Sequence, residues 1–174
     1  NGLVDVVIPR GSARLIQAVV QNATVPVIET GAGVCHTFVD ESADCDMARR
    51  IAFNAKVQRP SVCNAMETLL VHEKVADAFL PQMLKDYFSA GVTIFGCEQT
   101  QKFDSRIQAA TEEDWATEYG DLRLSVKIVR DLDEALAHIA RYSTRHSECI
   151  VTRNMENARR FQAEVDAAVV YVNC

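Results

Sequence analysis

The sequence has no excess of positive charge: 18 lysine and arginine residues stand against 24 aspartate and glutamate residues, which gives a net charge of −6 over 174 residues. A nucleic-acid-binding protein needs a basic face to neutralise phosphates, so this class is disfavoured. No apolar run approaches the span of a bilayer, and the N-terminus lacks the charged-then-apolar pattern of a signal peptide. Repeats, low-complexity runs and flexible linkers are absent as well. These absences favour a cytoplasmic protein whose partners include neither nucleic acid nor a membrane.

Cysteine is present, but never as a C-x-x-C pair. The six cysteines are Cys35, Cys45, Cys63, Cys97, Cys149 and Cys174. A secreted disulfide framework is usually shorter and richer in cysteine, so we expect reduced thiols in a cytosolic protein. The histidines and cysteines never fall at the short spacings of zinc ligands, so no metal site is expected.

Short β-rich runs alternate with helical patterns along the chain. We expect strands at 4–8, 25–28, 34–39, 67–71, 92–95, 125–129, 149–152 and 168–172. Several of these runs are apolar throughout, which is typical of strands covered on both faces. The alternation predicts an α/β fold with an open, mostly parallel sheet and helices on both faces.

Two helices carry recognisable start signals. Asp131 and Glu134 form a capping-box pattern in front of an apolar stripe. Ser42 is the expected cap of a helix near Asp44, which has acidic residues in its first turn.

A third apolar stripe, over 79–88, predicts a helix that ends at Gly91. Pro81 is expected in its first turn, where a missing N–H group costs least. His138 lies on the polar side of a later amphipathic helix and is expected at the surface. The polar stretch 101–123 is interpreted as a long excursion from the sheet.

Both ends of the chain adjoin apolar runs. The chain begins with Asn1 rather than Met, enters the run 4–8 at once, and stops two residues after the run 167–172. This arrangement predicts a fragment of a larger protein.

The segment around Cys63 has the features of a reactive thiol site. Pro60 disfavours helical geometry at Arg59, so the chain must turn just before the cysteine. Ser61 is a candidate cap for a new helical turn, which would place Cys63 among free N–H groups, with Arg59 and Lys56 adding positive charge. Both effects would lower the pKa of a thiol. The alternative is that Cys63 is a small buried apolar residue, as free cysteine often is.

The same segment carries a family motif. Residues 54–71 read N-A-K-V-Q-R-P-S-V-C-N-A-M-E-T-L-L-V. This resembles the active-site motif of γ-glutamyl phosphate reductases, N-A-K-x-Q-R-P-x-x-C-N-A-x-E-x-L-L-V, which surrounds their catalytic cysteine. Further family-like segments occur in order at 9–11, 31–36, 39–40, 126–129, 142–147 and 168–173. The resemblance therefore spans nearly the whole chain.

The resemblance implies a domain organisation. The family belongs to the aldehyde dehydrogenase superfamily, in which a cofactor domain and a catalytic domain meet with the cysteine in the crevice between them. Residues 1–34 are then a C-terminal remnant of the NADP-binding domain, and residues 35–174 are the catalytic domain.

The resemblance also implies an activity: NADPH-dependent reduction of γ-glutamyl phosphate to glutamate 5-semialdehyde and phosphate, in proline biosynthesis. A thiolate suits this reaction because it attacks an acyl phosphate readily and gives a thioester that accepts hydride. Cys63 is the implied nucleophile. Two alternatives remain open, namely another aldehyde dehydrogenase-like semialdehyde oxidoreductase and a non-catalytic domain that retains the fold.

Five further residues are candidates for binding. Arg59 is a candidate for holding the departing phosphate or the substrate carboxylate, with a surface ion pair as the alternative. Asn64, next to the cysteine in the motif, is a second substrate-binding candidate. Gly11 and Ser12 open a helix and form a natural phosphate seat for the cofactor. Glu118 corresponds to a glutamate that related enzymes place on the nicotinamide ribose, with a solvated acid as the alternative.

The implied cofactor is NADP(H), and the implied partners are γ-glutamyl phosphate, a glutamate 5-kinase and, at full length, further copies of the same chain. Origin from a monofunctional or a bifunctional kinase–reductase stays open, as do the oligomeric state and the preference for NADPH over NADH. We expect this chain to be inactive alone because half of the implied cofactor site is missing.

Overall fold

The computed structural model describes residues 2–11, 13–29 and 31–174, in two compact units that divide between Ala32 and Gly33. The N-terminal unit contains helix α1 (Ala13–Asn22). The elements of the C-terminal unit are β1 (Cys35–Val39), α2 (Cys45–Val57), β2 (Met66–His72), α3 (Glu73–Ser89), β3 (Thr93–Gly96), α4 (Glu98–Gln101), β4 (Gln108–Ala109), α5 (Glu112–Trp115), β5 (Arg123–Val129), α6 (Leu132–Tyr142), β6 (Ser147–Val151), α7 (Met155–Glu164) and β7 (Val169–Val172).

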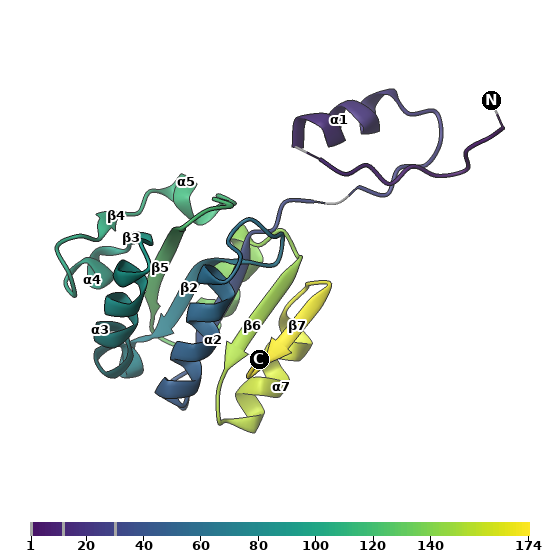
Figure 1. Cartoon of the computed structure of the whole chain (residues 1–174). Helices are drawn as coiled ribbons and strands as arrows, with labels where there is room; N and C mark the ends of the chain where they lie inside the picture. The colour runs from purple at the N-terminus through teal and green to yellow at the C-terminus, as the bar shows by residue number, and fades with distance from the viewer. Residues whose placement is uncertain (1, 12, 30) are drawn as a thin grey trace. The chain divides into compact units, whose positions relative to one another are not determined.

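The C-terminal unit is built on one seven-stranded sheet with the order β4-β3-β5-β2-β1-β6-β7 (Figure 1). Every neighbouring pair of strands is parallel, so each connection must cross over a face of the sheet. The predicted α/β class with a parallel sheet is confirmed. None of the helices in the described part of the chain combines the length and the apolar character that crossing a bilayer requires.

The central strands β1 and β2 are buried on both faces along their whole length. Val39, Leu69 and Val71 pack in a core with α2 and α3. Phe38 and Leu70 point to the other face, into a core with α6 and α7. Two-sided burial explains why these strands lack the apolar–polar alternation of a half-exposed strand, although polar residues are buried in them as well, such as Thr37 in β1 and Thr68 in β2.

The first two predicted strands are wrong. Residues 4–8 and 25–28 contribute only one isolated parallel bridge, between Val7 and Val27. The side chains around the bridge stay exposed, with Val4 at 54% and Ile8 at 63%. Two short segments without a longer ladder bury too little apolar surface to form a stable sheet.

The helix caps follow the predictions in part. Asp131 accepts a hydrogen bond from the N–H of Glu134 and caps α6, which is one half of the expected capping box; the Glu134 carboxylate accepts from the N–H of Arg130 and not from that of Asp131. Helix α2 is capped by Asp44, not by Ser42: the Asp44 carboxylate accepts hydrogen bonds from two first-turn N–H groups. The hydroxyl of Ser42 instead donates to Asp40 at 2.7 Å, because the buried carboxylate is the stronger acceptor.

Pro81 lies in the middle of α3, so its expected place in the first turn is wrong. Strand β2 runs directly into α3, and the ring Nδ1 of His72 accepts the hydrogen bond from the N–H of Lys74 that caps the helix. Pro81 lies on the exposed side, where water can hydrate the carbonyl that loses its partner, while the apolar stripe on the other side holds the helix in place.

His138 is buried, with 4% of its surface exposed, so the expected surface position is also wrong. The polar excursion 101–123 returns to the sheet, and Trp115 from α5 packs edge-on against the His138 ring at 5.4 Å between centroids. The Tyr142 ring lies 4.6 Å from the same imidazole. Burial lowers the pKa of His138 to about 2, so the ring is neutral at physiological pH.

A buried carboxylate, Asp40, ties the end of β1 to α7 and is 1% exposed. It accepts hydrogen bonds from Ser42 at 2.7 Å, Thr152 at 2.6 Å and Asn157 at 2.9 Å. Burial alone would raise the pKa of Asp40, but these hydrogen bonds outweigh burial and hold the pKa below the usual 3.8. Asp40 is therefore ionised, and it holds these segments together.

Replacing Asp40→Ala is expected to lower the free energy of unfolding by about 3 kcal/mol, because the buried hydroxyl of Thr152 and the half-buried donors of Ser42 and Asn157 lose a charged acceptor. The stabilising contribution of Asp40 is complete above its unfolded-state pKa of about 3.9 and is lost as the pH falls through the lower folded value. Urea unfolding at neutral pH and at pH ~3 should therefore show the difference from wild type shrinking in acid.

The matched control is Asp133→Ala, since the Asp133 side chain is 75% exposed and pairs only at the surface with Arg160. Its unfolding midpoint should stay near that of wild type. Equal losses in the two variants would contradict the assigned role of Asp40.

Candidate active site

Cys63 lies in the loop that joins α2 to β2, and the loop consists of two linked turns. The N–H of Val62 donates to the carbonyl of Arg59 at 3.4 Å, which places Pro60 at the second position of the first turn. The N–H of Ala65 donates to the carbonyl of Val62 at 2.9 Å and closes the second turn around Cys63. No helix begins anywhere in 58–65, so the expected helix start at Ser61 is wrong. The chain must enter β2 at Met66, which leaves room for turns only.

The thiol of Cys63 is exposed, which is opposite to the alternative of a buried apolar cysteine. Within the described residues, no acceptor pairs with the backbone N–H of Cys63 or with that of Asn64. The loop therefore offers an accessible sulfur atom beside two free amide donors. Donors of this kind are what an oxyanion formed at the sulfur-bound carbon requires.

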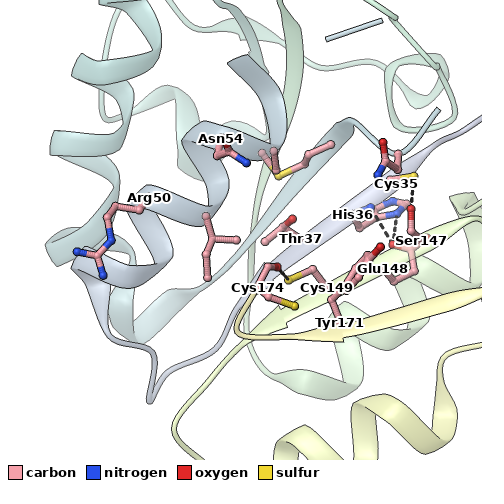
Figure 2. A pocket seen from close by; sticks show the side chains of 14 residues that line it. Cys35, His36, Thr37, Arg50, Asn54, Ser147, Glu148, Cys149, Tyr171 and Cys174 are labelled. Atoms are coloured by element: carbon pink, nitrogen blue, oxygen red, sulfur yellow. Dashed lines mark hydrogen bonds and ion pairs between the residues drawn. The ribbon is translucent and has the colours of Figure 1, made fainter. Parts of the chain in front are cut away.

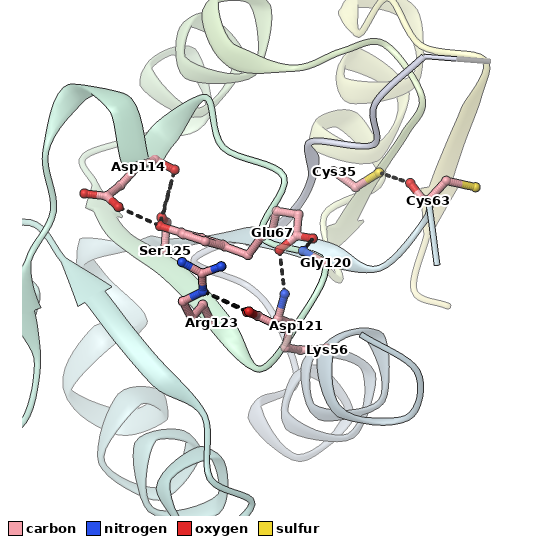
Figure 3. Close-up of polar contacts among 10 residues, drawn as sticks. Cys35, Lys56, Cys63, Glu67, Asp114, Gly120, Asp121, Arg123 and Ser125 are labelled. Atoms are coloured by element: carbon pink, nitrogen blue, oxygen red, sulfur yellow. Dashed lines mark hydrogen bonds and ion pairs between the residues drawn. The ribbon is translucent and has the colours of Figure 1, made fainter. Parts of the chain in front are cut away.

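The segment that leads into β1 contacts the backbone of Cys63. A Cβ atom placed on Gly33 would lie 1.7 Å from the carbonyl oxygen of Cys63, so only glycine fits at this position. The thiol of Cys35 donates to the same carbonyl oxygen at 3.3 Å, and it lies 3.3 Å from the hydroxyl of Ser147 in β6. Figure 3 shows the thiol of Cys63 pointing away from Cys35. Burial raises the pKa of Cys35 to about 11, which keeps this thiol protonated as a donor.

The sheet has an irregularity next to Cys35. The register between β1 and β2 shifts between Cys35 and His36, which is a β-bulge. The carboxylate of Glu148 accepts hydrogen bonds from the backbone N–H of His36 at 2.7 Å and from the hydroxyl of Ser143. Its distance to the ring Nδ1 of His36 is 3.0 Å. The buried carboxylate thus satisfies a donor beside the bulge, which would be costly to leave unpaired.

Lys56 does not direct its charge at the cysteine, contrary to expectation. Its ammonium group is buried and lies 2.5 Å from the carboxylate of Glu67, whose other oxygen accepts the N–H of Gly120 at 3.1 Å (Figure 3). Burial lowers the pKa of Lys56 and raises that of Glu67, and the attraction between the two charges opposes both shifts. The positive charge at the loop that is open to solvent is that of Arg59, which is exposed.

A pocket of about 460 Å³ lies next to the loop, between α2 and the strands β1, β6 and β7 (Figure 2). Asn64 lines it, together with Asn54 and Arg50 of α2 and Thr37 of β1. Neither Cys63 nor Arg59 is among its lining residues. The structure therefore places Asn64 at a cavity and leaves Arg59 on open surface.

Glu118 is exposed and lies in the segment 117–121 between α5 and β5, which we call the Glu118 turn. Two residues later, Gly120 donates its N–H to Glu67 at 3.1 Å. Burial is the main cause of the raised pKa of Glu67, and the negative charge of Glu118 adds to it. The turn that carries Glu118 is thus fastened to the base of the cysteine loop.

Of the two cofactor-binding candidates in the N-terminal unit, the structure describes Gly11, whereas Ser12 lies outside the described residues. Gly11 is exposed and has a φ of 153°, and a Cβ there would lie 2.7 Å from the Leu15 side chain. The first turn of α1 contains no acidic residue, and Arg14 within it and Arg10 before it are exposed. The described residues at this helix start therefore carry positive charge and no negative charge.

Several residues of the site were not predicted from the sequence. Gly33, Cys35, Glu67 and Ser147 were expected only as members of family-like segments, and Gly120 was not expected to take part. The glycine before an apolar strand was the available signal for Gly33, since such a glycine often marks a close backbone approach.

Comparisons with known proteins identify the class first. A propionaldehyde dehydrogenase from Clostridium phytofermentans superposes with a TM-score of 0.76 over 98% of this chain and 47% of its own, at 16% identity. At that identity the likeness concerns the fold alone, which is therefore that of the aldehyde dehydrogenases. No family model matches the sequence.

The sequence comparisons are more specific. γ-Glutamyl phosphate reductases from Caldanaerobacter subterraneus and Moorella thermoacetica are 61% and 62% identical to 99% of this chain. The crystal structure of the γ-glutamyl phosphate reductase from Thermotoga maritima superposes with a TM-score of 0.95 at 53% identity, over 98% of this chain and 41% of its own. The chain belongs to the γ-glutamyl phosphate reductase family, as its motifs predicted. It spans about 42% of the length of the Caldanaerobacter relative and 41% of the Moorella one.

Proposed function

We propose that this chain is the nucleophile-bearing part of an enzyme that reduces γ-glutamyl phosphate to glutamate 5-semialdehyde and phosphate in proline biosynthesis. The observation that carries the proposal is the exposed thiol of Cys63 beside the free N–H groups of Cys63 and Asn64, in a chain homologous to reductases of that name. The domain boundaries that we propose are 1–34 for the end of an NADP-binding domain and 35–174 for the catalytic domain.

The chemistry proposed for Cys63 is nucleophilic. Its thiolate attacks the acyl carbon of the substrate, the carbonyl oxygen becomes an oxyanion, and the C–O bond to phosphate breaks to leave a thioester. The N–H groups of Cys63 and Asn64 donate to the oxyanion. The same sulfur is the leaving group when the aldehyde is released.

The remaining residues bind and orient. Arg59, exposed beside the loop, is proposed to hold the departing phosphate or the substrate carboxylate, and Asn64 is proposed to contact the substrate from the pocket side. When bound, NADP(H) supplies the hydride for the reduction. Gly11 and Ser12 at the start of α1 are proposed to hold its phosphates, and Glu118 its ribose.

The reaction is testable in reverse with a protein of the relatives' full length. We expect reduction of NADP⁺ by glutamate 5-semialdehyde only when inorganic phosphate is present, because phosphate must release the acyl group from Cys63. Oxidation that proceeds equally well without phosphate would favour the alternative, an aldehyde dehydrogenase acting on another semialdehyde.

The reactivity of the Cys63 thiol distinguishes the proposed reductase from a non-catalytic domain. Cys63 should react with iodoacetamide at neutral pH faster than each of the other five cysteines, and equal rates would favour the non-catalytic alternative. A cytoplasmic location, a glutamate 5-kinase partner, self-association and inactivity of this chain alone stay predictions.

A further inference from the structure

A buried ion pair closes the base of the cysteine loop. Lys56 lies in the last turn of α2, before the loop, and Glu67 is the second residue of β2, after it. Their side chains are 0% and 1% exposed, and the ammonium nitrogen lies 2.5 Å from the carboxylate oxygen. The contact fixes the two ends of the loop relative to each other.

The carboxylate of Glu67 also holds a third segment. Its second oxygen accepts the N–H of Gly120 at 3.1 Å, in the turn that carries Glu118. The neighbouring Tyr119 ring faces the Lys56 ammonium at 5.9 Å. The Tyr119 hydroxyl lies 2.9 Å from that of Ser125 in β5, which fixes the turn to the sheet. One carboxylate therefore connects the start of the loop, its end and the Glu118 turn (Figure 3).

General stability does not explain a charged pair at this place. Moving two charges out of water is unfavourable, and well-packed apolar residues of similar volume often serve a core equally well or better. What an ion pair adds is a fixed geometry, because the carboxylate has separate, directional sites for the ammonium group and for the N–H of Gly120. Such fixed geometry matters most where reacting groups must be aligned.

We propose that Lys56 and Glu67 are positioning residues that set the cysteine loop and the Glu118 turn relative to each other. This inference rests on the proposed function, in which Cys63 receives the acyl group and Glu118 contacts the cofactor. Neither side chain of the pair is proposed to touch the substrate or the cofactor.

The decisive variant is the apolar pair Lys56→Met with Glu67→Leu, in a chain of the relatives' full length. Because both charges leave together, and because the half-buried N–H of Gly120 that loses its acceptor can be reached by water, the thermal midpoint should stay close to wild type. We expect kcat to fall by at least about tenfold, as loss of alignment by a fraction of an ångström would cause. The KM for NADP(H) should rise as well, since the Glu118 turn loses its anchor. A merely structural pair would leave kcat and KM unchanged once the fold is intact.

The matched control is Lys74→Met with Glu41→Leu, the same exchange at an ion pair of 2.6 Å whose side chains are 68% and 39% exposed. Its kcat should equal that of wild type. If the buried double variant fails to fold, the Glu67→Asp variant tests the proposal instead. It keeps both charges and moves the carboxylate back by one methylene group. It should lower kcat while the thermal midpoint stays close to wild type. A kcat within twofold of wild type in a folded variant would overturn the proposal.

Amide hydrogen exchange separates this proposal from the proposed function. In the apolar double variant, peptides covering 58–65 and 117–121 should both exchange several-fold faster, while those of α6 stay unchanged. Faster exchange in both segments of a protein without reductase activity would retain the positioning role and reject the proposed function. Unchanged exchange and unchanged kcat in an active enzyme would reject the positioning role alone.

Discussion

Replacing Cys63→Ser in the full-length enzyme is expected to lower kcat by at least about 10⁴-fold. A serine hydroxyl is not ionised at neutral pH, and without a neighbouring base it is a poor nucleophile toward an acyl phosphate. The fold should be unaffected, with a free energy of unfolding within about 0.5 kcal/mol of wild type, because the thiol is exposed. Steady-state kinetics and urea unfolding on the same preparations check both expectations.

Cys45→Ser is the matched control for this substitution. Cys45 is partly buried at the first position of α2. The 13 residues of that helix place it about 20 Å from the end that leads into the Cys63 loop. Its kcat should stay at the wild-type value. Residual activity in Cys63→Ser at a tenth of wild type or more would contradict the assignment of the nucleophile.

Gly33→Ala is expected to lower kcat by about 100-fold. The new Cβ would lie 1.7 Å from the carbonyl oxygen of Cys63 and 2.6 Å from its carbonyl carbon. Both are backbone atoms that cannot rotate away, so the nucleophile loop itself must move. Forcing an extra methyl group into this contact should also lower the free energy of unfolding by about 1–3 kcal/mol.

Gly31→Ala separates this local effect from a general effect of losing glycine. Among the described residues, a Cβ at Gly31 meets no atom within 4 Å, so kcat and stability should stay near wild type. The rate of Cys63 alkylation, measured beside kcat, should change only in Gly33→Ala. Normal turnover by that variant would show that the close contact does not hold the loop in its active position.

The sheet was predictable because its strands are buried on both sides. Val39 and Leu69 face one core while Phe38 and Leu70 face the other, so apolar residues occupy successive positions of these strands instead of alternating with polar ones. The same rule failed for residues 4–8, where the run is equally apolar but only Val7 pairs, in one bridge. An apolar run predicts that a segment is stabilised by burial. It does not show whether another part of the chain can pack against it.

The features of the candidate site that depend on neighbouring residues in the sequence could be predicted. Pro60 correctly indicated a turn before Cys63, because its ring restricts the neighbouring backbone. The electrostatics could not be derived in the same way: Lys56 looked like a cation near the thiol, but it is buried against Glu67. His138 failed for a similar reason, since Trp115, which covers its ring, comes from a separate excursion of the chain. Contacts between distant segments decide these cases, and no spacing rule encodes them.

The hydrogen bonds of Cys35 have a consequence for the stage of folding at which the Cys63 loop becomes fully supported. This thiol joins segments 28 and 112 residues away, and β1 lies between β2 and β6 in the sheet. During synthesis, Ser147 leaves the ribosome after both Cys35 and Cys63, because it follows them in the chain. The Cys35 thiol can therefore make both of these hydrogen bonds only once β6 lies beside β1, and until then the carbonyl of Cys63 lacks this part of its support.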